Sequence, residues 1–140
     1  MDNQLEMPAE MKESFLVIGG CPVSATIQII GGKWKVVILY LISYKISRFS
    51  EIHRLIEGIS KKTLTEQLRE LERDGIISRT VYAEVPPRVE YRMTDKGLTL
   101  RPIIFAMRDW GMQFGADSMI CRQKSGPAAA GVILPANSSI

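Results

Sequence analysis

The sequence predicts a mainly helical α+β domain, and three observations lead to that prediction. Apolar residues recur at helical spacing through most of the chain, as Leu64, Leu68 and Leu71 do. Residues 76–93 instead alternate apolar with polar side chains, which is typical of two paired strands. The 140 residues are 46% hydrophobic and 24% charged, so the chain is long enough and apolar enough to fold as one globular domain.

The chain is expected to divide into three segments. Residues 1–20 should form an N-terminal arm that packs residues 15–18 on the body, and residues 21–118 the folded domain. Residues 119–140 are small, rich in Pro, Gly and Ala and aperiodic, which predicts a flexible tail. The acidic N-terminus lacks the positive charge of a secretory signal, and the sequence has no apolar stretch of about 18 residues. We therefore expect a soluble, cytoplasmic protein that does not enter a membrane.

The first part of the domain predicts two helices. Cys21 and Pro22 have the residue types of an N-cap and a first helical position, because proline lacks an N–H that would be unpaired there. This helix should end at Gly31 and Gly32. Residues 33–43 are apolar almost all round, which favours a buried helix at the centre of the core.

The middle of the chain predicts a strand and two further helices. Residues 46–49 fit a short strand, and Ser50 then fits the cap of a brief helix that ends at Gly58. Ser60 is placed to cap a longer amphipathic helix that Gly75 stops. The tight connection between these two helices is typical of a helix-turn-helix unit.

The last part of the domain predicts a hairpin and a helix. Residues 76–82 and 89–93 fit its two strands, and the loop of residues 83–88 is stiffened by two prolines. Thr94 is expected to cap a last helix in which Pro102 introduces a kink. This order of elements is that of a winged helix-turn-helix domain, with the hairpin as the wing.

The helix after Ser60 carries the residues that favour DNA binding. Its outward face mixes cations with side chains that hydrogen-bond base edges, which suits insertion into the major groove. Arg88, at the end of the wing loop, is expected to enter a minor groove, and Lys33 and Lys35 to contact phosphates. The expected DNA-binding residues are Ser60, Lys61, Lys62, Thr63, Thr65, Gln67, Arg69, Arg88, Lys33 and Lys35. The alternative is that the interleaved glutamates and arginines form an ordinary solvated, ion-paired helix face.

Several longer motifs occur in a fixed order along residues 21–114. They are Cys21-Pro22-Val23, Gly31-Gly32-Lys33-Trp34-Lys35, Arg48-Phe49-Ser50-Glu51, the run of residues 58–72, and Val85-Pro86-Pro87-Arg88-Val89-Glu90-Tyr91. In these motifs the sequence resembles the HxlR-type winged helix-turn-helix regulators, which are related to the MarR regulators. The resemblance implies that residues 60–73 form the recognition helix and residues 83–88 the wing. Ala83 departs from the family pattern, in which proline is common at this point of the wing.

The resemblance also implies a homodimer that is joined through the first and last helices and binds a palindromic operator in double-stranded DNA, as a repressor. The residues themselves agree, because the last helix carries more apolar side chains than a domain of this size buries. The expected dimer-interface residues are Ile27, Ile103, Met107, Trp110 and Phe114.

Cys21 is a candidate sensor of oxidants or electrophiles. Several members of the resembled family sense such compounds through a cysteine just before the first helix, which Cys21 matches in position. A helix N-terminus favours the thiolate, the reactive form of the side chain. Cys121 is a second candidate, through a Cys21–Cys121 bridge between subunits, although sequence separation does not establish the short distance that a disulfide needs. The alternative is that Cys21 is a small, inert, buried helix cap.

Other functions are less well supported by the residues. Two cysteines and a single histidine, His53, are too few for a zinc site, so we expect neither a metal nor a cofactor, and no enzyme. Trp34, Phe105 and Trp110 fit core positions better than a ligand pocket, and His53 a surface position. The alternatives that stay open are a regulator with a small-molecule effector or none, a winged-helix module for protein assembly, and, last, a thiol peroxidase.

Overall fold

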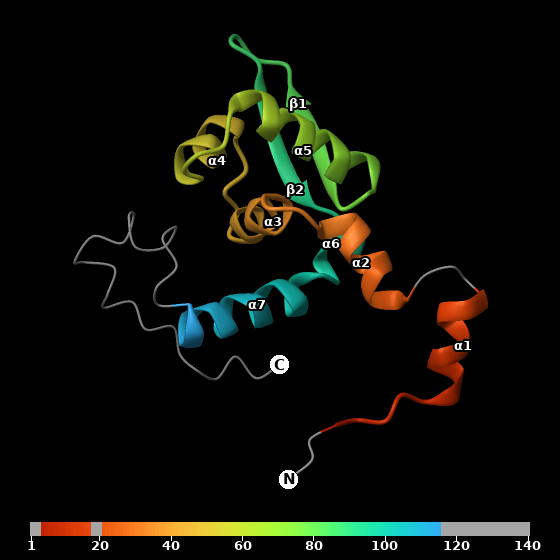
Figure 1. Cartoon of the computed structure of the whole chain (residues 1–140). Coiled ribbons are helices and arrows are strands. Elements are labelled where there is room, and N and C mark those ends of the chain that lie inside the picture. Colours follow the sequence, from red (N-terminus) through yellow and green to blue (C-terminus); the bar gives the residue numbers. More distant parts are fainter. Residues whose placement is uncertain (1–3, 18–20, 116–140) are drawn as a thin grey trace.

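The computed structural model describes residues 4–17 and 21–115 of the chain (Figure 1). Its elements in order are α1 Ala9–Val17, α2 Pro22–Ile30, α3 Lys35–Ser43, α4 Phe49–Leu55, α5 Lys61–Arg73, β1 Ile77–Tyr82, β2 Arg88–Met93, α6 Asp95–Leu98 and α7 Arg101–Phe114. The two strands form an antiparallel sheet, so the prediction of a mainly helical α+β domain is confirmed. Helix α1 lies within the expected arm, where no helix was predicted. The expected tail, residues 119–140, lies outside the described residues.

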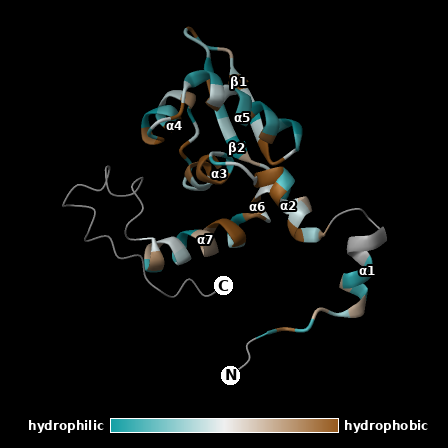
Figure 2. Cartoon of the chain, in the orientation of Figure 1, coloured by the Kyte–Doolittle hydropathy of each residue, from teal (hydrophilic) through white to brown (hydrophobic). Residues whose placement is uncertain are grey.

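Helices α2 and α3 follow the sequence prediction closely. Cys21 is the N-cap of α2, Pro22 opens the helix, and Gly31 is its C-cap. In α3, Ile38 and Leu39 are completely buried, and this helix contacts α5, α7 and β2. Figure 2 shows α3 as a hydrophobic helix between the sheet and α7. Within the described residues no single helix is long and apolar enough to cross a bilayer, although α2 and α3 meet that length and composition together, across a bend of 75°.

The segment before α4 differs from the prediction. Residues 46–49 form no strand, because only one backbone hydrogen bond joins them to the sheet, from the Tyr91 N–H to the Ser47 carbonyl at 2.8 Å. The helix begins at Phe49 with Arg48 as its N-cap, so Ser50 lies inside the first turn and does not cap it. It ends at Leu55, earlier than the expected Gly58.

Helix α5 is formed as predicted. The Ser60 hydroxyl oxygen accepts the Thr63 N–H at 3.0 Å, which satisfies one of the unpaired donors of the first turn. Gly75, with φ of +74°, follows the last turn in the left-handed conformation that glycine adopts without strain. Leu64, Leu68 and Leu71 are fully or almost fully buried, so the amphipathic pattern of the sequence is the pattern of burial.

The wing hairpin begins and ends close to the predicted residues. Ile77 pairs with Met93 at one end of the ladder and Tyr82 with Arg88 at the other. Arg88 is therefore the first residue of β2, whereas the sequence predicted it as the last residue of the wing loop.

The last predicted helix is two helices. Thr94 caps α6, a short helix, by accepting the Gly97 N–H at 3.0 Å, and its hydroxyl also donates to the Gly75 carbonyl at 2.6 Å. A new helix, α7, begins at Arg101. Pro102 occupies the first turn of α7, where a missing N–H breaks no hydrogen bond, so it introduces no kink.

Candidate nucleic-acid interface

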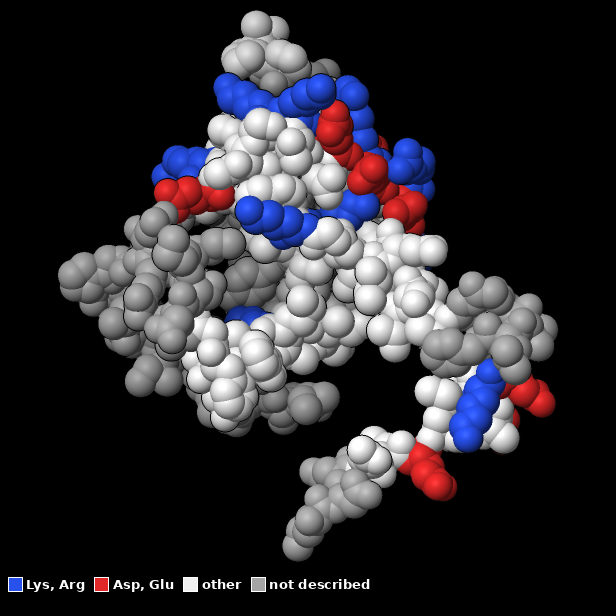
Figure 3. Space-filling model, viewed as in Figure 1, with Lys and Arg blue, Asp and Glu red and all other residues white. Residues whose placement is uncertain are grey.

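The exposed side of α5 carries cationic side chains. Its three buried leucines point into the core, and at helical spacing this turns Lys62, Arg69 and Arg73 toward solvent. Figure 3 shows that lysines and arginines gather on this end of the molecule, around α4, α5 and the hairpin, with a few acidic side chains among them. Only Arg73 of these three forms an ion pair within the described residues, a long one of 4.0 Å to Glu70. The exposed face of α5 is therefore more than a network of paired charges.

The N-terminal turn of α5 presents two cations. Lys61 and Lys62 are exposed and form no ion pair with any residue that the structure describes. The Ser60 hydroxyl is occupied locally, because it donates to the Thr63 hydroxyl at 2.9 Å while it caps the helix. The positive end of the helix dipole and two ammonium groups together make this turn attractive to an anion.

The remaining candidates on α5 differ in exposure. Arg69 is exposed, whereas Thr65 and Gln67 are half-buried on the two flanks of the helix. The Thr65 hydroxyl donates to the Lys61 carbonyl at 2.8 Å, so its oxygen is left as an acceptor. Gln67 keeps an amide group that presents both donor and acceptor atoms at the surface.

The two lysines before α3 have different surroundings. Lys33 is exposed, with its ammonium 4.7 Å from the centre of the Trp34 ring. Lys35 is only 9% exposed and pairs with Glu70 of α5 at 2.9 Å. The structure thus disfavours the expected phosphate contact of Lys35, because its side chain is buried and its ammonium group joins α3 to α5 through Glu70. Hydrogen bonding from Lys35 lowers the pKa of the Glu70 carboxyl below its ordinary value of 4.5.

The Arg88 side chain has partners within the wing, which disfavours its expected insertion into a minor groove. The Arg88 guanidinium lies 4.1 Å from the centre of the Tyr82 ring. It also forms ion pairs of 3.4 Å with Glu84 and 3.8 Å with Glu90. The exposed tip of the loop is instead the uncharged run Val85-Pro86-Pro87. Arg88 is thus part of the internal support of the wing.

The acidic partners of Arg88 and Lys35 were not predicted from the sequence. Glu84 lies four residues before Arg88, but this spacing indicates an ion pair only on a helix, and residues 83–87 form a loop. No local signal pairs Lys35 with Glu70, since the two are brought together only when α5 packs beside α3.

Cys21 lies at the start of α2, away from α5. Its sulfur accepts the Ser24 N–H at 3.3 Å and lies 3.2 Å from the Ser24 hydroxyl. The Ser24 hydroxyl, and then its N–H, lower the pKa of the Cys21 thiol below its ordinary value of 9.0. The thiol is half-exposed and is a free cysteine, so the fully buried alternative is wrong. Cys121 lies outside the described residues.

Helices α2 and α7 also carry exposed apolar residues. The expected dimer-interface residues are all exposed: Ile27 is 57% exposed, Ile103 41%, Met107 51%, Trp110 65% and Phe114 61%. The four residues of α7 repeat at helical spacing and form one exposed stripe along the helix, beside buried Ile104. Figure 3 shows hardly any charge on the visible side of α2 and α7.

The remaining aromatic candidates are partly as predicted. Trp34 and Phe105 are half-buried against the core, whereas Trp110 is exposed and is not a core residue. His53 is half-buried and stacks on Phe49, with ring centres 6.3 Å apart. Among the residues that the structure describes, no group of three or more His, Cys, Asp or Glu side chains is arranged to hold a metal ion.

Comparison with known proteins gives consistent matches. The model of the HxlR-like helix-turn-helix family matches residues 29–119. The HTH-type transcriptional regulator YdeP of Bacillus subtilis is 53% identical over 95 residues, which cover 68% of this chain and 74% of YdeP. The solved structure of the redox regulator HypR in its oxidized form superposes with a TM-score of 0.64 at 48% identity, covering 66% of this chain and 96% of HypR. A MarR-family protein from Porphyromonas gingivalis gives a TM-score of 0.61 at 40% identity, covering 67% of this chain and 92% of its own.

The Lys35–Glu70 pair makes a prediction for stability against pH. The folded-state pKa of Glu70 is lowered, so its contribution to the free energy of unfolding is present above pH 4.5 and is lost as the pH falls through the lowered pKa. We expect Glu70→Gln to be less stable than the wild type at neutral pH, with the difference shrinking in acid. Urea unfolding from pH 7 to pH 3 measures this, with Glu66→Gln on the exposed side of α5 as the control. A stability difference that is unchanged across this range would contradict the prediction.

Proposed function

The chain belongs to the HxlR-like helix-turn-helix family of transcriptional regulators, and from this premise we propose that it binds a palindromic operator as a homodimer and represses transcription. The chain is a helix-turn-helix regulator and not an enzyme. The observation that supports the finer proposal is the exposed, cationic first turn of α5, where Lys61 and Lys62 have no ion-pair partner among the described residues. We expect the protein to act in the cytoplasm, where its DNA partner lies.

The proposed contacts with DNA come from α5 and its surroundings. A recognition helix reaches base edges with its N-terminal residues, so Lys61, Lys62 and Thr65 are placed to contact bases or phosphates there. Gln67 offers the paired donor and acceptor that reads adenine. Lys33 supplies a phosphate contact at the junction of α2 and α3. The proposed wing contact is made by the uncharged tip, with Arg88 holding its shape.

The test of operator binding uses DNA from directly upstream of the chain's own gene. Lys61→Ala should weaken binding to all sequences and lower the slope of log affinity against log salt by about one, because a single phosphate contact is lost. Gln67→Ala should lose about 1–3 kcal/mol of discrimination between the operator and scrambled DNA. Fluorescence anisotropy at two salt concentrations measures both, with Lys12→Ala in α1 as the control. Wild-type protein that binds operator and scrambled DNA equally would overturn the proposal.

The homodimer is supported by the apolar surface on α2 and α7. Four large exposed apolar residues along one helix, as on α7, are uncommon on monomeric proteins and mark association sites. Trp110 and Phe114, whose tilted rings have centres 5.2 Å apart, supply the large aromatic contacts that dominate interface energies. A two-fold dimer would place its two α5 helices on successive turns of one face of the duplex, about 34 Å apart.

Substitution of Trp110 tests the dimer. Trp110→Glu should weaken association by on the order of 2–4 kcal/mol, since it buries a charge and removes an aromatic anchor. Gln113→Glu is the matched control, because it adds the same charge to an exposed position of α7 beside the apolar stripe. Sedimentation velocity measures the fraction of dimer. Dimers that stay intact in Trp110→Glu would remove this face of α7 from the interface, and equal dissociation of both variants would show that the effect is not specific to the apolar stripe.

We further propose that Cys21 senses oxidants or electrophiles, which is the finer form of the redox hypothesis. Its lowered pKa increases the thiolate fraction, and its half-exposed position admits a reagent. HypR, a redox regulator, is similar to this chain in sequence and fold. An adduct on Cys21 would lie at the start of α2, next to the proposed dimer interface, from which a small rotation of the subunits would change the spacing of the two α5 helices. The rival within the same class is a regulator with a small-molecule effector or none.

The thiol hypothesis has a kinetic and a functional test. In a Cys121→Ser background, Ser24→Ala should raise the pKa of Cys21 and slow its alkylation by iodoacetamide at pH 7 severalfold. In the unmodified chain, diamide takes two electrons and two protons from a pair of thiols, which become one disulfide, with Cys121 as the second thiol. This treatment should weaken operator binding by the wild type but not by Cys21→Ser. If diamide changes operator binding in neither protein, the chain is still a DNA-binding regulator, but Cys21 is not its redox switch.

A further inference from the structure

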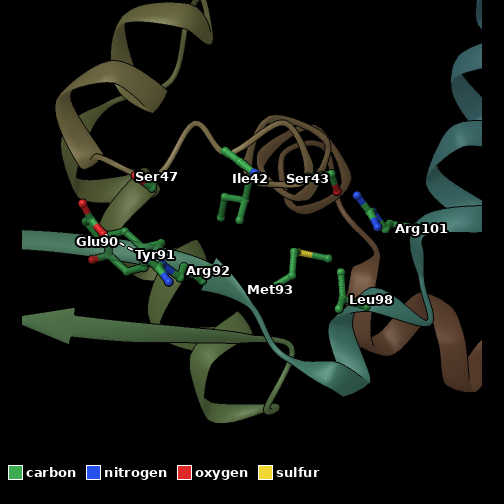
Figure 4. Close-up of a pocket in the computed structure, with 10 residues that line it drawn as sticks. Ile42, Ser43, Ser47, Glu90, Tyr91, Arg92, Met93, Leu98 and Arg101 are labelled. Atoms are coloured by element: carbon green, nitrogen blue, oxygen red, sulfur yellow. Dashed lines mark hydrogen bonds and ion pairs between the residues drawn. The ribbon is translucent and has the colours of Figure 1, made fainter.

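A cleft of about 420 Å³ lies where the end of α3, strand β2 and the α6–α7 junction meet (Figure 4). Ile42, Met93 and Leu98 form an apolar wall, and Figure 4 shows these three side chains close together between the ribbons of α3 and α6. The volume lies within the range of small-molecule sites in proteins. The cleft includes no residue of α5, so it is separate from the proposed DNA-binding face.

The charge that the cleft leaves unpaired is positive. Its one carboxylate, Glu90, is already paired with Arg92 at 3.3 Å and with Arg88 at 3.8 Å. Lys45 and Arg101 also border the cleft and form no ion pair with any residue that the structure describes. Figure 4 shows Arg101 on the side of the cleft near Ser43, whose hydroxyl also faces this region. The Arg101 guanidinium lies 6.0 Å from the centre of the Phe105 ring, a contact that leaves its charge without a carboxylate partner. An anion that entered the cleft would thus meet two cations that no described carboxylate pairs.

Lys45 occupies a backbone position that favours glycine. Its φ is +63°, and among the described residues it is the only one other than glycine with a positive φ. The Lys45 N–H donates to the Ile42 carbonyl at 2.9 Å and the Ile46 N–H to the Leu41 carbonyl at 3.2 Å, which is the Schellman ending of a helix. Glycine adopts this conformation without strain, whereas lysine does not. Strained backbone of this kind is concentrated at functional sites, and here it carries a cation of the cleft.

We propose that this cleft binds a small organic carboxylate with an apolar body. The Lys45 ammonium and the Arg101 guanidinium would hold the carboxylate by charge-assisted hydrogen bonds. The apolar body would lie against Ile42, Met93 and Leu98. Because the cleft joins β2 of the wing to the start of α7, a bound ligand would act on the operator affinity, and this one consequence rests on the proposed function.

The test of the site is direct titration of the full chain with naphthoate, without DNA. The wild type should bind naphthoate and should bind naphthamide, its uncharged counterpart, about tenfold more weakly. Lys45→Gly should also weaken naphthoate binding about tenfold, while its unfolding temperature stays at or above that of the wild type, because glycine relieves the strained φ. Arg101→Gln provides the same test without a change of backbone. Lys12→Gln, which removes one positive charge far from the cleft, should bind as the wild type does.

Three results would overturn the proposal. They are equal binding of naphthoate and naphthamide, unchanged naphthoate binding in both Lys45→Gly and Arg101→Gln, and a loss in Lys12→Gln as large as that in Lys45→Gly. The first would show that charge is not recognised, the second that the ligand lies elsewhere, for example on the apolar face of α7, and the third that only the net charge matters. Because no DNA is present, a chain that failed to recognise an operator would still give a clear result here.

Discussion

The packing of α5 on the core is the interaction on which the rest of the structure depends. Leu64, Leu68 and Leu71 are withdrawn from solvent, and burial of each such side chain contributes about 1.5–3 kcal/mol. They lie at i, i+4 and i+7, so a single stripe holds the helix down over its whole length. The same burial sets the rotation of the helix about its axis. Lys62 and Arg69 are exposed for that reason, and not because any partner inside the protein orients them.

Directional interactions then set the position of α5 more exactly than burial does. The Lys35–Glu70 pair ties the C-terminal part of α5 to the start of α3, and the Ser60 cap and Gly75 define the two ends of α5. The Thr94 hydroxyl, which donates to the Gly75 carbonyl, joins the end of α5 to the beginning of α6. A shift of α5 along its axis would break several of these contacts at once. The polar groups that position α5 are thus already paired within the protein. This reduces the reorganisation that binding of DNA by α5 would require.

The surfaces of the molecule are separated by element. The cations of α5 lie at one end, and the apolar stripe of Met107, Trp110 and Phe114 lies on α7. The cleft beside Lys45 lies between them and is bordered by β2 and by the first residue of α7. Because β2 also carries Arg88, the residue that supports the wing, one strand connects the cleft to the proposed DNA-binding side. A ligand at the proposed cleft site would thus contact the same strand that carries the support of the wing.

The sequence by itself determined the features that depend on neighbours along the chain. The leucine spacing of α5, the caps at Cys21 and Ser60 and the alternation of the hairpin were predicted correctly, because each is set by residues within a few positions. Tertiary structure decided the rest. The predicted strand at residues 46–49 is reduced to one hydrogen bond to β2. Lys35, expected to contact a phosphate, is paired with Glu70, and Arg88, expected to enter a minor groove, contacts Tyr82, Glu84 and Glu90. A charged side chain looks the same in the sequence whether or not the fold brings a carboxylate to it, so only packing separates the cations that support the fold from those left to bind a partner.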